Sequence, residues 1–228
     1  VGKRAARIET GGVAKADTPE MQARLIEIGE DFVEFGRFSL DLWRRAVLGS
    51  IEFRDMIFSG AYLHRTHSMG LVDEDNRVNF YDGHVRVVDV DGAEVVRYHP
   101  ADYTEHIAEH VEPWTYLKFP YLKRYGWKGL EDGPESGVYR ATPLGRLNAA
   151  EGMATPLAQE AYEEFYDYMG GKPVHATLAT HWARLIEMLY AGERMLELAR
   201  DPGITDPDIR AIPTETPGEG VGTVEAPR

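Results

Sequence analysis

Apolar residues recur at intervals of three, four and seven over positions 21–42, which is the period of a helix with one apolar face. Thr18-Pro19-Glu20 supplies an N-cap hydroxyl, a proline at the first helical position and an acid in the first turn. The pattern predicts a helix from Thr18 to about residue 48, where Gly49-Ser50 ends it, and a shorter helix over 51–59. The apolar positions are Met21, Leu25, Ile28, Phe32, Phe35 and Leu42.

Two further helices are expected in the second half of the chain. Thr155-Pro156 begins the first, and Gly170-Gly171 ends it. The second covers residues 178–199, where leucines and Trp182 fall on one stripe before Asp201-Pro202. From there to the end, proline and glycine recur, and they predict a long irregular segment over 201–228.

The period changes to two between residues 71 and 99. Asp82-Gly83 and Asp91-Gly92 separate segments rich in β-branched residues, and such Asp-Gly pairs are strong hairpin signals. We therefore predict a three-stranded antiparallel meander here. The expected architecture is a single domain over 1–228 of the mainly α (α+β) class, with a helical core of long helices and a small β-meander insertion at 71–99.

Residues 103–153 are the most aromatic part of the chain, with six aromatic side chains in the fourteen positions 114–127. The prolines at 113, 120, 134 and 143 exclude a long helix through this stretch. A short helix is expected over 103–111. The density of aromatic residues indicates that the stretch threads through the interior or lies under a partner surface.

The charge balance narrows the classes of partner. Lysine and arginine number 25 against 38 acidic residues, a net charge of −13, which disfavours a phosphate backbone and therefore nucleic acid. No apolar run approaches the roughly 20 residues of a membrane span. The chain has no cysteine, so disulfides, thiolate metal sites and a cysteine nucleophile are excluded within it.

Histidines and acids supply the candidate chemistry. His106 and His110 would share a face of the expected helix and could contribute two ligands to a metal ion. Two ligands alone do not make a metal site, so the favoured interpretation is that both are helix-surface or packing residues. For His64 and His67 a solvated pair near a helix end is favoured. The run Asp73–Asn76 offers oxygen ligands for calcium but lacks the EF-hand glycine and glutamate, which favours a polar turn.

Basic residues interleave with the aromatic ones in the central stretch. Such a composition can stack nucleic-acid bases. The acidic total argues against it and favours amphipathic side chains that cover apolar surface. These basic residues are Lys118, Lys123, Arg124 and Lys128.

Four segments carry a resemblance to a known family. The chain resembles the large, catalytic subunit of [NiFe]-hydrogenases, in the cytoplasmic group of F420-non-reducing, methyl-viologen-reducing and sulfhydrogenase enzymes. The resemblance implies a large-subunit-like helical fold in a heteromeric cytoplasmic complex. The segments are GLVDEDNRVNFYDG (70–83), HIAEHVEPWTYLKFPYLK (106–123), GVYRATPLGRLNAAEGMATPLAQE (137–160) and ITDPDIRAIPTETPGEGVGTVEAPR (204–228).

The resemblance implies cofactors outside this chain. Such a subunit holds nickel and iron with two CxxC pairs, and neither pair is present here, so the chain resembles the middle of a longer subunit. The nickel–iron centre would belong to the full-length subunit, with no metal or cofactor ligand in this chain. Expected partners are a small subunit with iron–sulfur clusters and further electron-transfer subunits.

The end of the chain matches the family's EAPRG motif at Glu225–Arg228. By resemblance, Pro227 and Arg228 are the expected catalytic residues, lying over the metal centre, where a guanidinium could stabilise charge or assist proton movement. One departure concerns the family's RVGPLAR, which is RATPLGR at Arg140–Arg146 here. Thr142 then replaces a glycine, which matters if that backbone angle is unusual.

The resemblance implies part of a catalytic subunit that reversibly splits H2 into protons and electrons, which pass to the small iron–sulfur subunit. This chain alone is expected to be inactive. The alternative is a non-catalytic structural or assembly paralogue that has lost the metal-binding cysteines. Without the resemblance, the residues indicate only a helical interaction module.

Overall fold

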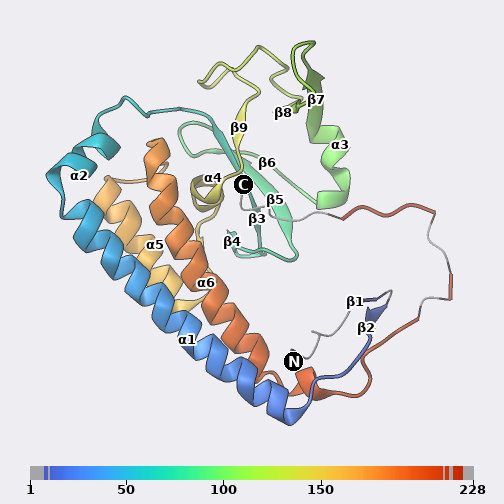
Figure 1. Cartoon of the computed structure of the whole chain (residues 1–228). Helices are drawn as coiled ribbons and strands as arrows, with labels where there is room; N and C mark the ends of the chain where they lie inside the picture. The colour runs from blue at the N-terminus through green and yellow to red at the C-terminus, as the bar shows by residue number, and fades with distance from the viewer. Residues whose placement is uncertain (1–7, 10, 213, 216–217, 223–228) are drawn as a thin grey trace.

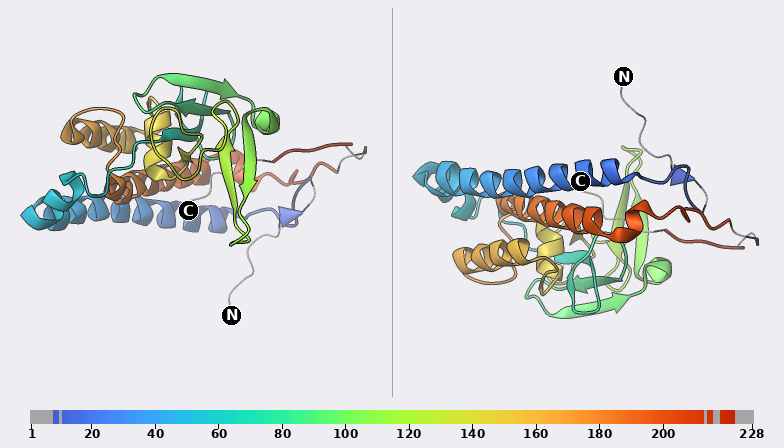
Figure 2. Two further views of the ribbon diagram at one scale, coloured as in Figure 1. Left: turned by 90° about the horizontal axis from the view of Figure 1, so that it is seen from above. Right: turned by 90° about the horizontal axis from the view of Figure 1, so that it is seen from below.

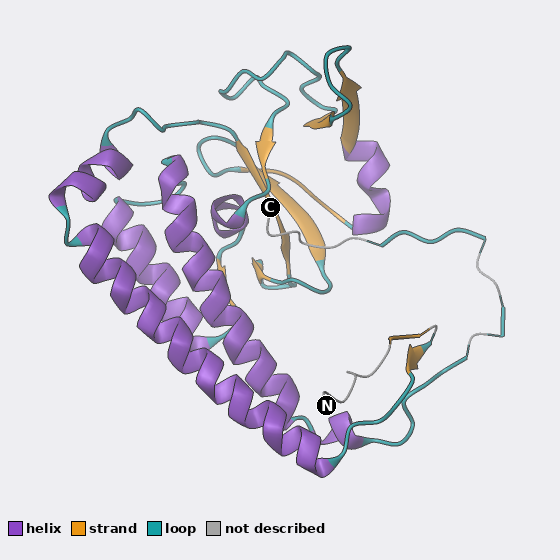
Figure 3. Ribbon diagram, in the orientation of Figure 1, coloured by secondary structure: helices purple, strands orange, loops and turns teal. Residues whose placement is uncertain are grey.

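Three long helices form one side of the structure, and a six-stranded sheet lies on the other side (Figure 1). The structure is a computed structural model and describes residues 8–9, 11–212, 214–215 and 218–222. Figure 2 shows the order of the layers: α1 is outermost, α6 packs on it, and α5, α4 and the sheet follow. Figure 3 shows how little of the C-terminal segment is helix or strand.

Helix α1 (Pro19–Trp43) begins where the sequence predicts. The Thr18 hydroxyl accepts a hydrogen bond from Met21 N at 3.3 Å, and Pro19 occupies the first helical position. A π-helical turn, η1 (Arg44–Leu48), extends the helix to the predicted end. Helix α2 (Ile51–Phe58) follows, capped by the Ser50 hydroxyl.

Two glycines let α1 approach α6 (Thr180–Arg200) closely. A Cβ added at Gly29 would lie 3.1 Å from Leu196 Cα, and one added at Gly36 would lie 3.0 Å from Leu189 Cδ1. Both distances are shorter than ordinary van der Waals contact, so larger residues would push the two helices apart. The seven-residue spacing of the glycines keeps them on one side of α1.

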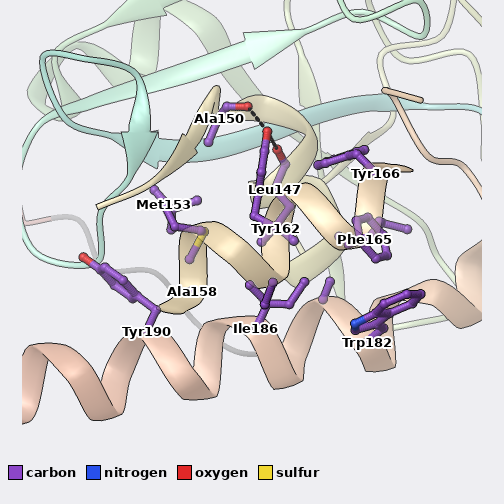
Figure 4. Packing of buried hydrophobic residues seen from close by; sticks show 14 of the residues in the cluster. Leu147, Ala150, Met153, Ala158, Tyr162, Phe165, Tyr166, Trp182, Ile186 and Tyr190 are labelled. Carbon is purple, nitrogen blue, oxygen red and sulfur yellow. Dashed lines mark hydrogen bonds between the residues drawn. The ribbon is translucent and has the colours of Figure 1, made fainter. Parts of the chain in front are cut away.

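The main core lies between α6, α5 (Pro156–Met169) and the short helix α4 (Pro143–Ala149). Phe165 meets Trp182 edge to face with ring centroids 5.2 Å apart, and Ile186 packs in the same cluster (Figure 4). The Tyr162 hydroxyl donates to the Ala150 carbonyl at 2.9 Å, so this buried polar group has a partner. Gly170, with φ of 84°, ends α5 in the left-handed conformation.

The sheet is larger than the expected meander. Its strand order is β10-β4-β3-β5-β6, and β9 pairs with β3. Strand β3 was not predicted because nearly all its residues are buried, which removes the alternation of polar and apolar positions. The strands are β3 (His67–Val72), β4 (Arg77–Val78), β5 (His84–Val88), β6 (Glu94–Tyr98), β9 (Tyr139–Arg140) and β10 (Gly152–Met153).

The helix expected over 103–111 is wrong beyond His106. Helix α3 (Tyr103–His106) gives way to strand β7 (Ile107–Val111), which forms an antiparallel hairpin with β8 (Lys118–Leu122). The pairing of Ile107 with Leu122, which is buried, fixes the register. Trp114 and Tyr116 in the hairpin loop are exposed, so this part of the aromatic stretch is not in the interior.

The remaining elements are short. From Asp206 onward the described residues contain no helix or strand, apart from an isolated bridge between Gly12 and Arg210. Within the described part of the chain, no helix combines the length and apolarity that crossing a membrane requires. These short elements are β1 (Ile8–Glu9), β2 (Gly12–Val13), η2 (Pro100–Asp102), η3 (Thr177–Ala179) and η4 (Pro202–Thr205).

The main core makes a direct stability prediction. Phe165→Ala removes a fully buried ring and should lower the free energy of unfolding by about 3 to 5 kcal/mol, measured by urea denaturation. The control Phe53→Ala removes an exposed ring of α2 and should change it by about 0.5 kcal/mol or less. Equal losses in the two variants would place the main core elsewhere.

Candidate functional site

Three segments distant in sequence meet in a buried polar junction, which we define as residues 64–68, 140–148 and 174–177. Strand β3 pairs with β9 in parallel, so Ser68 lies opposite Arg140. On the other side, His64 N donates to the His175 carbonyl at 3.2 Å. The junction therefore ties the sheet, α4 and the α5–α6 connection together.

Asn148 is the polar centre of this junction. Its Nδ2 donates to the Val174 carbonyl at 2.8 Å, and its Oδ1 accepts from Val174 N at 3.0 Å. The Tyr166 hydroxyl donates to the same Oδ1 at 2.9 Å. All three groups are buried, and a fully bonded amide of this kind fixes one arrangement of the connection.

A buried ion pair joins α4 to α6. Arg146 Nε and Nη2 donate to the two carboxylate oxygens of Glu187, each at 2.6 Å. Burial raises the pKa of Glu187, and the Arg146 guanidinium opposes that shift. A Cβ at Gly70 would lie only 2.9 Å from Arg146 Cα, so β3 passes directly over this residue.

Arg140 is a buried cation with neutral partners. Its Nη2 donates to the His64 carbonyl at 3.1 Å and to the Thr177 hydroxyl at 3.2 Å. It makes no ion pair with any carboxylate that the structure describes, and burial lowers its pKa. Thr142, which stands where the resembled family has a glycine, causes no backbone strain, because its φ is −85° and its conformation is extended. At Gly145, by contrast, a Cβ would overlap the Arg140 carbonyl.

The junction contains three histidines, His64, His67 and His175. The expected solvated pair of His64 and His67 is wrong for His67, which is 0% exposed and stacks on Tyr125 with ring centroids 4.4 Å apart. Burial lowers the pKa of His67 and of His175. The Nε2 of His175 lies 2.8 Å from the Val90 carbonyl and must donate to it, so each of these two rings is engaged in the fold.

His106 and His110 do not share a helix face, because strand β7 begins between them. His106 stacks on Tyr98 at 4.1 Å, whereas His110 stacks on Trp127 at 4.6 Å and lies 2.9 Å from Glu112. The favoured packing interpretation is therefore correct. Across the described residues, no three metal-binding side chains of His, Asp or Glu gather around one point.

The acidic run Asp73–Asn76 is a polar turn, which is the interpretation that the sequence favours over a calcium site. The Asp73 carboxylate accepts from Asp75 N at 2.9 Å and Arg77 N at 2.8 Å, and Asn76 adopts a positive φ of 58°. Of the basic residues in the aromatic stretch, Lys118 pairs with Glu109 at 2.7 Å. These contacts hold local turns and the hairpin rather than a ligand.

Pro227 and Arg228, the residues predicted to be catalytic, lie outside the described residues. The junction residues Asn148, Arg146 and Glu187 were missed. A weak signal existed in the polar residues embedded in the segment RATPLGRLNAA, since polar side chains among apolar ones are buried only when bonded. The hydrogen bonds that the structure describes in the junction hold its segments together, and none of them joins a hydroxyl group to a histidine or a carboxylate.

Comparison with known proteins finds components of hydrogenases. No family profile matches the chain. The chain is 41% identical over 218 residues to an iron-sulfur subunit of the F420-non-reducing hydrogenase of Archaeoglobus profundus, covering 96% of this chain and 45% of that protein. It is 45% identical over 163 residues to the NAD-reducing hydrogenase HoxS subunit beta of Cupriavidus necator, covering 71% of this chain and 32% of the relative.

A solved structure agrees with these relatives. A chain in the crystal structure of an NAD+-reducing [NiFe]-hydrogenase in the H2-reduced state superposes with a TM-score of 0.78 at 30% identity, over 90% of this chain and 44% of that one. The chain thus spans less than half the length of the relatives that it matches.

These names correct the assignment made from sequence. The relative from Archaeoglobus profundus, which matches 96% of the chain, is named an iron-sulfur subunit, not a large catalytic one. The expected role in splitting H2 at a nickel–iron centre is set aside on the same finding. The alternative, a structural or assembly paralogue that has lost its cysteines, comes nearer but also differs from that name.

The Arg146–Glu187 pair yields a prediction on charge burial. Arg146→Met leaves the Glu187 carboxylate buried without its partner and should lower the free energy of unfolding by about 3 to 5 kcal/mol. The double variant Arg146→Met/Glu187→Leu should lose less, because it leaves neither charge of this pair buried without its partner. Urea denaturation measures both. Arg24→Met breaks an exposed pair with Glu27 and serves as control, with a loss of about 1 kcal/mol or less.

The buried His67 predicts a pH dependence. Its folded-state pKa lies below the ordinary 6.5, so as the pH falls through 6.5 the unfolded chain binds a proton that the folded chain does not. Stability should therefore fall from about pH 7.5 toward about 5.5, with a slope from this group of at most about 1.4 kcal/mol per pH unit. His67→Gln should reduce that slope in urea titrations, and an unchanged slope would contradict the assignment.

Proposed function

We propose that this chain is a cysteine-free scaffold region of an iron–sulfur, electron-transfer subunit in a multi-subunit hydrogenase. The observation that carries the proposal is the 41% identity across 96% of the chain to a protein named as an iron-sulfur subunit of such an enzyme. The superposition on a chain of an NAD+-reducing [NiFe]-hydrogenase supports it. Hydrogenases are oxidoreductases, and this chain would contribute to one without carrying its chemistry.

The donor set of the chain does not fit an iron–sulfur cluster. Such clusters are held by cysteine thiolates, with histidine as an occasional replacement, and the chain has no cysteine. The histidines of the described part are separated; in the polar junction His67 is buried and His175 is half-buried, with its ring bonded to the Val90 carbonyl. Any cluster in such a protein is therefore held by residues other than these, and no electron-transfer step is assigned to this chain.

The geometry instead favours positioning of other parts. The polar junction and the Arg146–Glu187 pair lock the sheet to the helices, which gives a rigid frame. Beyond the frame, the β7–β8 hairpin exposes Trp114 and Tyr116, the latter 94% exposed. Exposed aromatic side chains of this size are enriched where proteins meet. The hairpin loop is therefore proposed as a contact with a neighbouring hydrogenase subunit.

Two measurements on the 228-residue chain test the proposal. After anaerobic incubation with iron and sulfide, the chain should hold no cluster, because it offers no thiolate, and stoichiometric iron and sulfide would overturn the scaffold assignment. When the tagged chain is co-expressed with the other subunits of an F420-non-reducing hydrogenase, they should be recovered with it in stoichiometric amounts. Failure to recover any would overturn the assignment to such a complex.

A matched pair of variants locates the contact. Trp114→Ser/Tyr116→Ser should reduce recovery of the other subunits by about tenfold, because exposed aromatic residues dominate such contacts. Tyr81→Ser removes a similarly exposed tyrosine from the loop between β4 and β5 and should leave recovery unchanged. Equal recovery with both variants would remove the hairpin loop from the interface.

A further inference from the structure

Helix α1 carries a second apolar stripe that lies beside its contact with α6. Its members recur mainly every seven residues, and all are exposed, with Phe35 at 52%. Phe38 joins them, its ring centroid 6.3 Å from that of Phe35. We call this set the α1 seam: Met21, Ile28, Phe35, Phe38 and Leu42.

The seam is distinct from the face that α1 buries. Gly29, Gly36 and Leu40 are buried, and the two glycines lie against Leu196 and Leu189 of α6. Ile28 and Phe35 directly precede these glycines in the sequence and are rotated by about 100° from them on the helix. Figure 2 shows α1 at the outer edge of the helical layer, where no described element covers that side.

A row of acidic residues borders the seam. Each occupies the position immediately before a seam residue, so the row repeats with the same seven-residue period and lies on one flank. All four side chains are exposed, and α1 as a whole has six acidic and two basic residues. The row consists of Glu20, Glu27, Glu34 and Asp41.

Two members of the acidic row pair with arginines. Arg24 Nη1 lies 2.7 Å from Glu27, and this exposed pair contributes little and can exchange for another. Arg44 Nη1 lies 2.5 Å from Asp41, but Arg44 is half-buried and its Nε also donates to Glu164 at 2.7 Å. On the opposite flank, residues 25 and 32 are half-buried and continue the apolar surface toward α6. The seam thus has apolar residues on one side and carboxylates on the other.

We propose that the α1 seam binds a basic amphipathic helix of a partner protein. A seven-residue apolar period is complementary to another helix packed nearly parallel to α1, knobs into holes. From Met21 to Leu42 the seam extends about 32 Å, which requires a partner helix of about 20 residues. The acidic row selects lysine or arginine beside the apolar positions of that helix.

Charge also argues against a second copy of this chain as the occupant. A symmetric pair of antiparallel α1 helices would place the two acidic rows opposite each other. Like charges in such a contact disfavour it. The proposal goes beyond the proposed function and does not depend on it, because it rests on α1 alone.

The test uses the 228-residue chain and two synthetic peptides of about 21 residues, a length that matches the seam. Both carry leucine at heptad core positions, and they differ only in lysine or glutamate at the flanking positions. By fluorescence anisotropy, the lysine peptide should bind at least about tenfold more tightly than the glutamate peptide, because only lysine complements the acidic row. The difference should shrink as salt is added.

Variants place the binding on the seam. Phe35→Glu should weaken binding of the lysine peptide by about tenfold or more, because it puts a charge in the apolar centre of the seam. Leu130→Glu, which changes an exposed leucine outside the helices, should have no effect. The charge reversal Glu27→Lys/Glu34→Lys should invert the preference in favour of the glutamate peptide.

Three results would overturn the proposal. The first is equal affinity for the two peptides, and the second is lysine-peptide binding that Phe35→Glu leaves intact. The third is a concentration-dependent dimer of the chain, seen by analytical ultracentrifugation and abolished by Phe35→Glu, which would assign the seam to a second copy. Circular dichroism of each variant separates loss of binding from loss of folding.

Discussion

The buried Arg146–Glu187 ion pair is the interaction on which the two layers of the structure depend. Two charges inside a protein are tolerated only when each satisfies the other in good geometry, and here both carboxylate oxygens are bonded. The pair fixes α4 against α6, while Gly70 lets β3 lie directly on Arg146. The sheet therefore has one permitted position relative to the helices, and the polar junction forms around that position.

Much of the helical layer could be predicted from the sequence, because its signals are local. Thr18 caps α1, Gly170 ends α5, and the apolar stripes follow the helical period. The sheet was underestimated for a physical reason: β3 is buried on both faces and shows no alternation. Likewise β7 is a strand only because β8 pairs with it, and the residues at 103–111 alone do not reveal that pairing.

The site was less predictable than the fold. Arg146 and Glu187 are separated by 41 residues, and Asn148 and Val174 by 26, so no short motif joins them. The resemblance placed the expected chemistry at residues 227 and 228, which lie outside the described part. It also assigned a subunit type that differs from the name of the Archaeoglobus profundus relative. Local spacing identifies histidine pairs readily, but whether they share a face depends on elements such as β7.

The chemically distinctive side chains among the described residues lie in the polar junction and on exposed surfaces. Asn148, Val174 and Tyr166 satisfy one another inside the junction, whereas Arg140 Nη1 is buried without a hydrogen-bond partner. The absence of cysteine excludes thiolate ligands within the chain. Exposed apolar surfaces among the described residues include the hairpin loop with Trp114 and Tyr116 and the α1 seam with its acidic border, and α2 also exposes Ile51 and Phe53. These surfaces lie on different elements and differ in charge pattern. Under the proposed function, a frame that presents two chemically different contact surfaces would hold two different partners in a fixed relation.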